Sequence, residues 1–210
     1  MNYILAFIIS YFIGSISGSY IIGKVLLNKD IRKFGSGNAG TTNAMRVFGK
    51  KAGIMTFLID FIKGIIVTVL IGKIFGKNYV PIGILGAVIG HDFPFYMNFK
   101  GGKGVATTLG ALSAFNLPLT LICFVVWFLG TFLTKIVSIG SILFFISLII
   151  VYTLMSQLSF LNIFIITIVA VLGIVRHKEN LKRIINGNEN KIGGKKWKSH
   201  YVVVEVGELQ

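Results

Sequence analysis

Long apolar segments alternate with short polar ones along most of this 210-residue chain. The apolar segments cover residues 3–27, 53–75, 80–89, 105–115, 117–133, 136–154 and 158–175. A helix needs about 20 apolar residues to cross a bilayer, so the third and fourth segments are too short unless flanking polar residues complete them. The pattern predicts an all-α polytopic membrane protein with about seven transmembrane helices, some of them short or broken.

The two short segments flank residues 91–104, which contain one Pro and several Gly. Non-helical backbone at membrane depth is tolerated only where it is buried in protein or lines a water-filled cavity. We therefore expect the region 91–104 to dip towards a site.

Lys and Arg lie mainly on one side of the predicted spans. They are concentrated in the loops 28–52 and 91–104, in the connection 134–138 and in the tail after residue 175, whereas the opposite side carries only Lys73 and Lys77. Positively charged loops of membrane proteins tend to stay in the cytoplasm. This places the N-terminus outside and the C-terminus in the cytoplasm, with every polar cluster on the cytoplasmic face.

Composition agrees with a membrane protein, because 54% of the residues are hydrophobic and only 13% are charged, against about a quarter charged in soluble domains. The first segment lacks a basic start and is long enough to span, so we expect a retained helix and no removable signal peptide. The net charge of +14 resides in juxtamembrane loops without interleaved aromatic residues, which predicts contact with anionic membrane lipid and excludes nucleic acid. The single cysteine, Cys123, cannot form an internal disulfide.

The stretch FGSGNAGTTNAMR at 34–46 is polar and rich in glycine. Successive main-chain N–H groups in such turns form anion-binding concavities, and an arginine fork fits phosphate bidentately. We predict a phosphate cradle here. Its candidate residues are Ser36, Asn38, Thr41, Thr42, Asn43 and Arg46.

A second cluster, KGGKGVAT at 100–107, begins an apolar helix. Free N–H groups and the positive end of the helix dipole beside Lys103 form an anion site in principle, with Gly101 and Gly102 as candidate phosphate binders. The spacing is not that of a Walker A loop. The alternative is an ordinary helix start with a snorkelling lysine.

Three further positions lie beside the last two predicted spans. Ser141 belongs to the sequence SIGS at 138–141, while His177 and Asn180 follow the seventh segment. The serines could instead cap a helix, a histidine next to the membrane is usually structural, and a Ser–His nucleophilic dyad is not demonstrated by the spacing.

Asp60 and Lys63 lie three residues apart inside a predicted span. Because ionisable groups at that depth pair or face a cavity, a structural pair is preferred over a proton relay. The histidines and carboxylates lack metal-ligand spacing, so we expect no metal.

Taken together, the motifs GSGNAGTTNAMR (35–46), KGGKGVAT (100–107), SIGS (138–141) and HKENLKR (177–183) resemble the bacterial acyl-phosphate-dependent glycerol-3-phosphate acyltransferases, the PlsY family. The resemblance covers about residues 10–190 in register. Ala39 stands where the family often has Pro, and Thr41 where it often has Ala. The resemblance implies a single integral membrane acyltransferase domain at 1–196, followed by a tail, 197–210, of unknown role.

The resemblance also implies an activity. The family transfers a fatty acyl group from acyl phosphate to the 1-hydroxyl of sn-glycerol 3-phosphate, giving lysophosphatidic acid and phosphate in the first step of bacterial phospholipid synthesis. It implies no cofactor, no metal, and a multi-pass protein of the bacterial inner membrane with its active site on the cytoplasmic side. We expect a monomer. The matching positions expected to be catalytic are Ser36, Arg46, Lys103, Ser141, His177 and Asn180.

Two other functions compete with this interpretation. A transporter or flippase for a phosphorylated molecule would also use broken helices, but carriers usually contain internal repeats and bind near the membrane midplane, and no repeat is visible here. A scaffold that only binds anionic lipid would leave the neutral Ser, Asn and Thr donors without a role.

Overall fold

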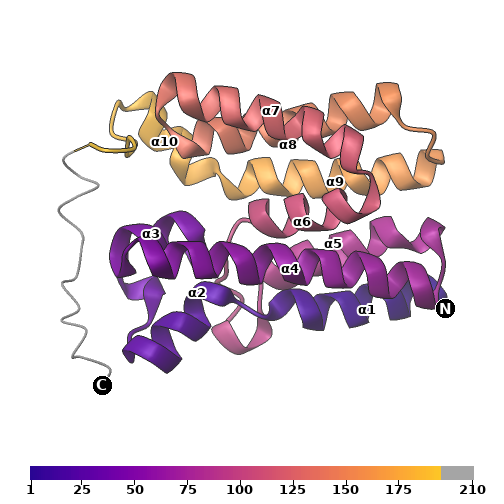
Figure 1. Ribbon diagram of the computed structural model, residues 1–210, viewed down its shortest axis with the longest axis horizontal. Helices are drawn as coiled ribbons and strands as arrows, with labels where there is room; N and C mark the ends of the chain where they lie inside the picture. Colours follow the sequence, from indigo (N-terminus) through magenta and orange to yellow (C-terminus); the bar gives the residue numbers. More distant parts are fainter. Residues whose placement is uncertain (195–210) are drawn as a thin grey trace.

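The computed structural model describes residues 1–194, in which every regular element is helical. Figure 1 shows the longer helices aligned along the long axis, with the N-terminus at one end and α3 and α10 at the other. The longer helices are α1 (Asn2–Ser15), α4 (Lys50–Ile74), α5 (Val80–Asp92), α6 (Val105–Phe115), α7 (Leu117–Thr134), α8 (Val137–Met155) and α9 (Phe160–Arg176). The shorter elements are α2 (Gly18–Ile21), the π-helix η1 (Ile22–Leu26), α3 (Thr41–Phe48), α10 (Lys178–Ile185) and the 3₁₀ turns η2 (Ile31–Lys33), η3 (Lys77–Tyr79) and η4 (Phe95–Met97).

Each of the seven predicted apolar segments contains a helix. Within residues 1–194, five helical stretches are long and apolar enough to cross a membrane, and a sixth if α9 and α10, bent by 48°, count as one span. With 11 residues, α6 extends only about 16 Å, short of a hydrocarbon core of about 30 Å. The predicted all-α membrane class is confirmed, while the count of seven crossings and the orientation of the termini stay predictions. The 197–210 tail lies outside the described residues.

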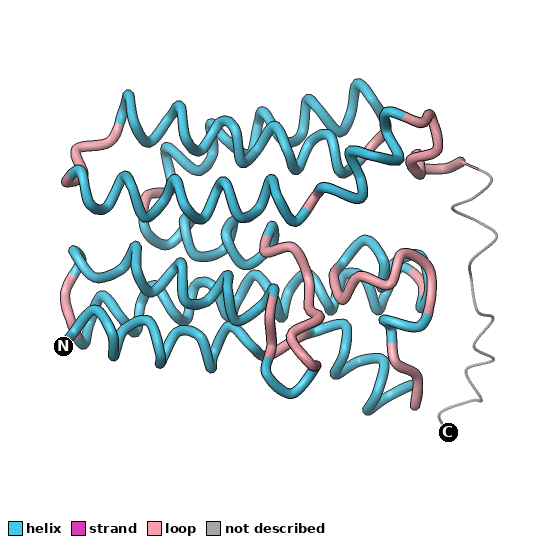
Figure 2. The backbone as a smooth tube through the Cα atoms, turned by 180° about the vertical axis from the view of Figure 1, so that it is seen from behind, coloured by secondary structure: helices cyan, strands magenta, loops and turns pink. Residues whose placement is uncertain are grey.

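Two interruptions bring irregular backbone into the apolar part of the molecule. The first span breaks at Ile16 and Ser17, between α1 and α2. The second interruption is the loop 93–104, which joins α5 to α6. It makes up most of the region 91–104 that was predicted to dip towards a site, while His91 and Asp92 of that region belong to α5. Figure 2 shows that most of the loop backbone lies towards the end of the molecule away from the N-terminus. The fold therefore gathers its polar connections at one end.

Small residues let the helices approach closely. Gly14 of α1 faces Ala87 of α5, and Gly64 of α4 faces the backbone of Thr107 in α6; a Cβ at either glycine would overlap the facing backbone. Helix association in a bilayer relies on such close packing. These contacts fix α6 against α4, so that the short helix has a defined place at the centre of the bundle.

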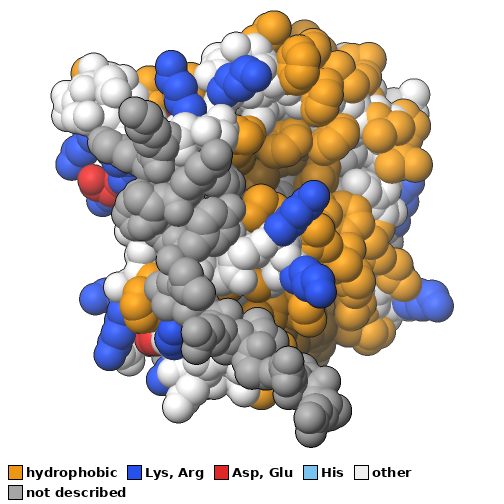
Figure 3. Space-filling view, turned by 60° about the vertical axis from the view of Figure 1, so that its left-hand side comes forward, with side chains coloured by type: hydrophobic (Ala, Val, Ile, Leu, Met, Phe, Trp, Pro, Cys, Tyr) orange, Lys and Arg blue, Asp and Glu red, His pale blue; other side chains and the backbone are white. Residues whose placement is uncertain are grey.

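The outward faces of the bundle are apolar. On α7, for example, Leu121, Val125, Phe128 and Phe132 are all about half exposed or more, and Figure 3 shows a broad hydrophobic surface on the right of the view. A hydrophobic surface of this extent on a protein marks a membrane or an interface. The exterior thus matches the span assignment made from helix length.

Candidate active site

A cavity of about 460 Å³ lies where α3, the start of α6, the start of α8 and α10 converge. Most of its polar side chains come from the segments that the sequence singled out, and most of its apolar wall comes from the longer helices. The apolar wall includes Met45, Phe57, Val105, Leu109, Phe124, Trp127 and Phe144.

All six residues predicted to be catalytic line this one cavity, although they come from four segments of the chain. Four of the predicted phosphate-binding residues line it as well, whereas Gly101 and Gly102 do not. The 35–46 stretch and Lys103 therefore meet in one place, as the prediction of a single pocket requires. The lining residues among the predicted set are Ser36, Asn38, Thr41, Thr42, Asn43, Arg46, Lys103, Ser141, His177 and Asn180.

The polar stretch 34–46 is part turn and part helix. It turns through Gly35 and Gly37, both with positive φ, and α3 then begins at Thr41, where a continuous turn was expected. Asn43 closes the turn from within, because its Oδ1 accepts the Ser36 N–H at 2.9 Å and its Nδ2 donates to the Phe34 carbonyl at 3.0 Å. The Asn43 side chain thus fixes the shape of the turn, while Asn38, Thr41 and Thr42 beside it line the cavity.

Arg46 projects from α3 into the cavity and is buried. Burial lowers the pKa of Arg46 below its ordinary value, and the carboxylate of Glu189 opposes that shift. Because arginine starts from so high a pKa, the guanidinium stays charged at neutral pH. It supplies a fixed positive charge beside the turn.

Lys103 enters the cavity from the loop that precedes α6. Its ammonium donates to Oδ1 of Asn180, a residue of α10. Burial, together with the positive charge of Arg183, lowers the pKa of Lys103 to about 8. The lysine is therefore a cation whose charge is sensitive to pH just above neutrality.

The two glycines before Lys103 serve the loop and not the cavity. The N–H of Gly101 donates to the Asp92 carbonyl and that of Gly102 to the His91 carbonyl, both at 3.0 Å. A Cβ at Gly102 would overlap the His91 ring. Since both N–H groups are already bonded within the loop, neither is left to bind a phosphate, and the two glycines serve close packing.

His177 and Asn180 lie at the corner between α9 and α10. His177 Nδ1 is 2.7 Å from the Gly173 carbonyl oxygen. Since a carbonyl can only accept, Nδ1 carries the hydrogen and Nε2 is the nitrogen left to accept a proton or hydrogen bond. On α8, Ser141 Oγ donates to the Val137 carbonyl at 3.0 Å.

Glu189 is a cavity residue that the sequence analysis missed. It follows α10, and its carboxylate accepts from Asn180 Nδ2 at 2.8 Å, Arg183 Nε at 2.6 Å and Ser138 Oγ at 3.3 Å. The only signal for it in the sequence is an isolated acidic residue in a strongly basic tail. Glu189 links α10 to the start of α8 and closes one side of the site.

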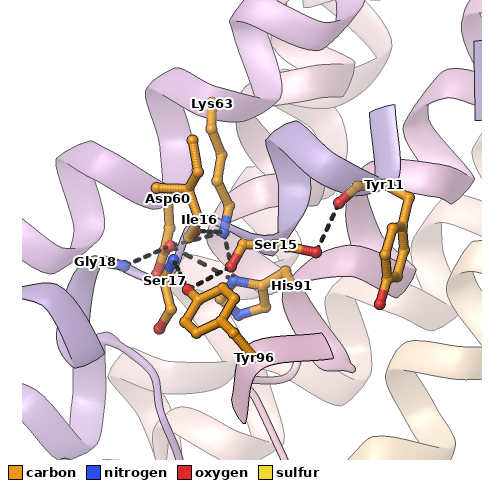
Figure 4. A network of polar contacts seen from close by, with 9 residues as sticks. All are labelled: Tyr11, Ser15, Ile16, Ser17, Gly18, Asp60, Lys63, His91 and Tyr96. Atoms are coloured by element: carbon orange, nitrogen blue, oxygen red, sulfur yellow. Dashed lines mark hydrogen bonds and ion pairs between the residues drawn. The ribbon is translucent and has the colours of Figure 1, made fainter. Parts of the chain in front are cut away.

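Figure 4 shows a second polar network, of which Asp60 and His91 also line the cavity. Lys63 Nζ is 3.0 Å from Asp60 Oδ1 and 2.8 Å from His91 Nδ1. Lys63 also donates to the Ile16 carbonyl, and the Gly18 N–H donates to Asp60 at 3.4 Å. Buried ion pairs persist where hydrogen bonds satisfy both charges.

Tyr96 completes this second cluster. Its hydroxyl donates to the Ser15 carbonyl at 2.7 Å and accepts the Ser17 N–H at 3.1 Å. Together these contacts bond the backbone exposed by the break in the first span. They favour the structural interpretation of the Asp60–Lys63 pair. Within the described residues, no group of three or more His, Cys, Asp or Glu is placed to hold a metal ion.

Residues 4–187 match the family described as Glycerol-3-phosphate acyltransferase. A curated relative of that name from Finegoldia magna is 43% identical, over 92% of this chain and 99% of the relative. Another relative of that name, from Clostridioides difficile, is 40% identical over 93% of this chain and 98% of the relative. The fold is similar to crystal structures of PlsY (YgiH), described as an integral membrane glycerol 3-phosphate acyltransferase. Its glycerol 3-phosphate form gives a TM-score of 0.84 at 38% identity, covering 92% of this chain and 96% of that one. Its lysophosphatidic acid form gives a TM-score of 0.80 at 37% identity, covering 91% of this chain and 95% of that one.

Proposed function

The chain belongs to the glycerol-3-phosphate acyltransferase family, and we propose that it transfers a fatty acyl group from acyl phosphate to the 1-hydroxyl of sn-glycerol 3-phosphate. The products are lysophosphatidic acid and phosphate, and the reaction is the first step of bacterial phospholipid synthesis. The observation that carries this proposal is that one cavity combines a cationic polar end with an apolar wall.

The cavity suits both substrates. Each carries a phosphate, and Arg46 and Lys103 supply two positive charges to the polar end. Ser36, His177 and Asn180 are suited to orient glycerol 3-phosphate, since each offers a neutral donor or acceptor. The apolar wall suits the alkyl chain of the donor, which could enter from the bilayer between the helices that form this wall.

The phosphate of the donor is expected to contact the turn and the start of α3. Thr41 Oγ1 is buried and has no hydrogen-bond partner within the described residues, and Asn38 and Thr42 lie beside it in the lining. A phosphate oxygen would satisfy such donors. Asn43 supports this contact indirectly, by holding the turn in shape.

The chemistry needs no nucleophile from the protein, because an acyl phosphate is already activated. The hydroxyl oxygen of glycerol 3-phosphate attacks the acyl carbonyl carbon, the bond from that carbon to the phosphate oxygen breaks, and phosphate leaves with the bonding electrons. The hydroxyl proton passes to a phosphate oxygen. Holding both reactants together contributes up to about 7–11 kcal/mol. Asn38 is suited to stabilise the developing oxyanion, and Ser141 would do so by turning its hydroxyl away from the Val137 carbonyl.

We further propose the setting in which this reaction occurs. The seven apolar segments cross the bacterial inner membrane, with the N-terminus outside and the cavity at the cytoplasmic surface. Residues 1–196 form one acyltransferase domain that works as a monomer. The bias of Lys and Arg supports this orientation, as does the gathering of polar loops at one end of the bundle.

The test is to incubate purified protein with palmitoyl phosphate and labelled glycerol 3-phosphate, with palmitoyl-CoA as a parallel donor. We expect labelled lysophosphatidic acid from the phosphate donor alone. A product formed only with palmitoyl-CoA would contradict the proposed donor. Accumulation of a covalent acyl-enzyme, in the wild type or in His177→Ala, would contradict direct transfer. Counterflow of labelled glycerol 3-phosphate in liposomes without acylated product would indicate a transporter.

A further inference from the structure

Arg176 is the last residue of α9 and directly precedes His177. Its guanidinium reaches across to the loop before α6, where Nη2 donates to the Gly102 carbonyl at 2.8 Å and Nε donates to the same oxygen at 3.2 Å. The guanidinium carbon also lies 4.8 Å from the centre of the Phe93 ring. One side chain therefore ties two segments that each deliver a cavity residue.

The same guanidinium binds the residue at which this loop begins. Nη2 donates to the Asp92 carbonyl at 3.4 Å, and Nε is 3.6 Å from the fully buried Asp92 carboxylate. The Asp92 carboxylate accepts no hydrogen bond from the described residues. Arg176 thus places a cation beside the buried Asp92 side chain, and it contacts both ends of the loop from one point.

We propose that Arg176 is a positioning residue that fixes Lys103 relative to His177. The inference rests on the proposed function, in which both of these residues meet the substrates. Lys103 follows Gly102 directly, so a bond to the Gly102 carbonyl limits where the Lys103 backbone can lie. Glycines flank Lys103 on both sides, and their conformational freedom makes an external tie necessary.

Arginine suits this role better than lysine. A guanidinium is planar and offers a fixed fork of donors, whereas an ammonium is a point charge on a flexible stem. Only the fork can bond the Gly102 carbonyl through two nitrogens while facing the Asp92 carboxylate and stacking on Phe93. Lysine at this position would keep the charge and lose the geometry.

The experiment compares four variants in the palmitoyl phosphate assay. Arg176→Lys keeps the charge, and Arg176→Gln removes it. The double variant Arg176→Gln with Asp92→Asn changes both members of the buried pair, so that no ionisable carboxyl is left without its partner if Arg176→Gln folds poorly. Lys178→Gln is the matched control, because Lys178 is exposed on the other side of His177. Each is assayed for kcat, for KM of glycerol 3-phosphate and for melting temperature, from pH 6 to pH 10.

We expect Arg176→Lys to lower kcat/KM about 10–100-fold, because misplacement by about 1 Å can have an effect of that size. We expect the loss to appear mainly as a higher KM for glycerol 3-phosphate, with an unchanged melting temperature. The control should match the wild type. The double variant should fold and show the same rise in KM.

The pH dependence of activity distinguishes a positioning role of Arg176 from a general contribution of Arg176 to folding. Lys103 faces the charges of Arg183, Glu189, Arg176 and Asp92, and also His177. Removing the positive charge of Arg176 should raise the pKa of Lys103, so the alkaline limb of activity should move to higher pH in Arg176→Gln. It should stay in place in Arg176→Lys.

Two results would overturn the inference alone while the wild type transfers acyl groups. One is a wild-type KM and kcat for Arg176→Lys. The other is a loss of activity in every Arg176 variant that disappears when rates are normalised to folded protein. A wild type without acyl transfer would instead overturn the proposed function, and this inference with it.

Discussion

At the polar end of the cavity, the Lys103 ammonium and the Asn180 amide already make hydrogen bonds within the protein. Asn180 accepts from Lys103 through Oδ1 and donates to Glu189 through Nδ2. An amide can do both at once, whereas a carboxylate can only accept and an ammonium can only donate. Asn180 is therefore the neutral link that lets a cation and an anion share one site without pairing directly.

The charge of Lys103 should set the alkaline limit of substrate binding. Burial lowers the pKa of Lys103 to about 8, so the ammonium form that attracts phosphate predominates below that pH and is lost above it. We expect KM for glycerol 3-phosphate to rise about tenfold for each pH unit above 8, since one proton is involved. Arginine stays protonated, so Lys103→Arg should show no such rise. A wild-type KM that is constant from pH 7 to pH 10 would contradict this role.

Gly35 should be intolerant of a side chain because of what surrounds it. Its φ is +60° and that of Gly193 is +76°, so alanine at either position meets a similar backbone cost of about 1–2 kcal/mol. At Gly35 alone, the added Cβ would overlap Oδ1 of Asn43, which holds the turn.

We therefore expect Gly35→Ala to lower kcat/KM at least about tenfold through a misplaced turn, and Gly193→Ala to leave it nearly unchanged. Steady-state kinetics on both variants provide the measurement. Equal effects in the two variants would show that the contact with Asn43 is unimportant.

At the scale of elements, the segment after α10 closes the site. Glu189 binds Arg183 and Asn180 of α10 and Ser138 of α8, while the Ile192 N–H donates to the Lys135 carbonyl at 2.8 Å, in the connection before α8. These bonds hold the start of α8, which carries Ser141, against the helix that carries Asn180.

Removing the charge of Glu189 should weaken the contacts that hold α10 against the start of α8. In Glu189→Gln, the ion pair with Arg183 becomes a neutral contact, and we expect a loss of about 1 kcal/mol, since the arginine is partly exposed. This corresponds to a fall of about 2–4 °C in melting temperature, accompanied by a lower kcat/KM. The control is Glu179→Gln on α10, where the pair with Lys182 is exposed and should contribute little. Similar melting temperatures for both variants would contradict the closure.

The apolar pattern predicted the seven helical segments because burial against lipid leaves a continuous signal in the sequence. It missed the break at Ile16 and Ser17, since the residues there are part of a long apolar run and the break is stabilised by Lys63, Asp60 and Tyr96 from elsewhere. It also missed α3 as a helix, because a glycine- and threonine-rich start resembles a turn. Such features depend on tertiary partners that local composition does not encode.

The candidate site residues were predicted by motif, and the structure brings ten of the twelve into one cavity. The two glycines that it leaves out bond to the carbonyls of His91 and Asp92, a use of the N–H groups that a glycine-rich motif cannot distinguish from anion binding. Glu189 and Arg176 were not singled out because their partners lie far away in the sequence.

At the scale of the whole molecule, the two ends differ in what their connections contain. One end carries the loops around residues 28–40 and 93–104 and the segment after α10, while the other carries η3 and the short connections between α6 and α7 and between α8 and α9 (Figure 1). The first of these ends is rich in charge, while the other carries only Lys73 and Lys77 among its lysines and arginines. If α6 completes a crossing despite its length, every connection falls on the side that the charge bias predicts.

Thiol labelling of single-cysteine variants tests this arrangement directly. In a Cys123→Ala background, the exposed positions are Lys33→Cys and Asn188→Cys at the charged end and Asn78→Cys and Gln157→Cys at the other. A membrane-impermeant maleimide added to intact cells should label the second pair several-fold more than the first, and inverted vesicles should reverse the order. Labelling of Asn78→Cys and Gln157→Cys from opposite sides would mean that α6 does not complete a crossing, because an odd number of the spans between these two positions would then cross the bilayer.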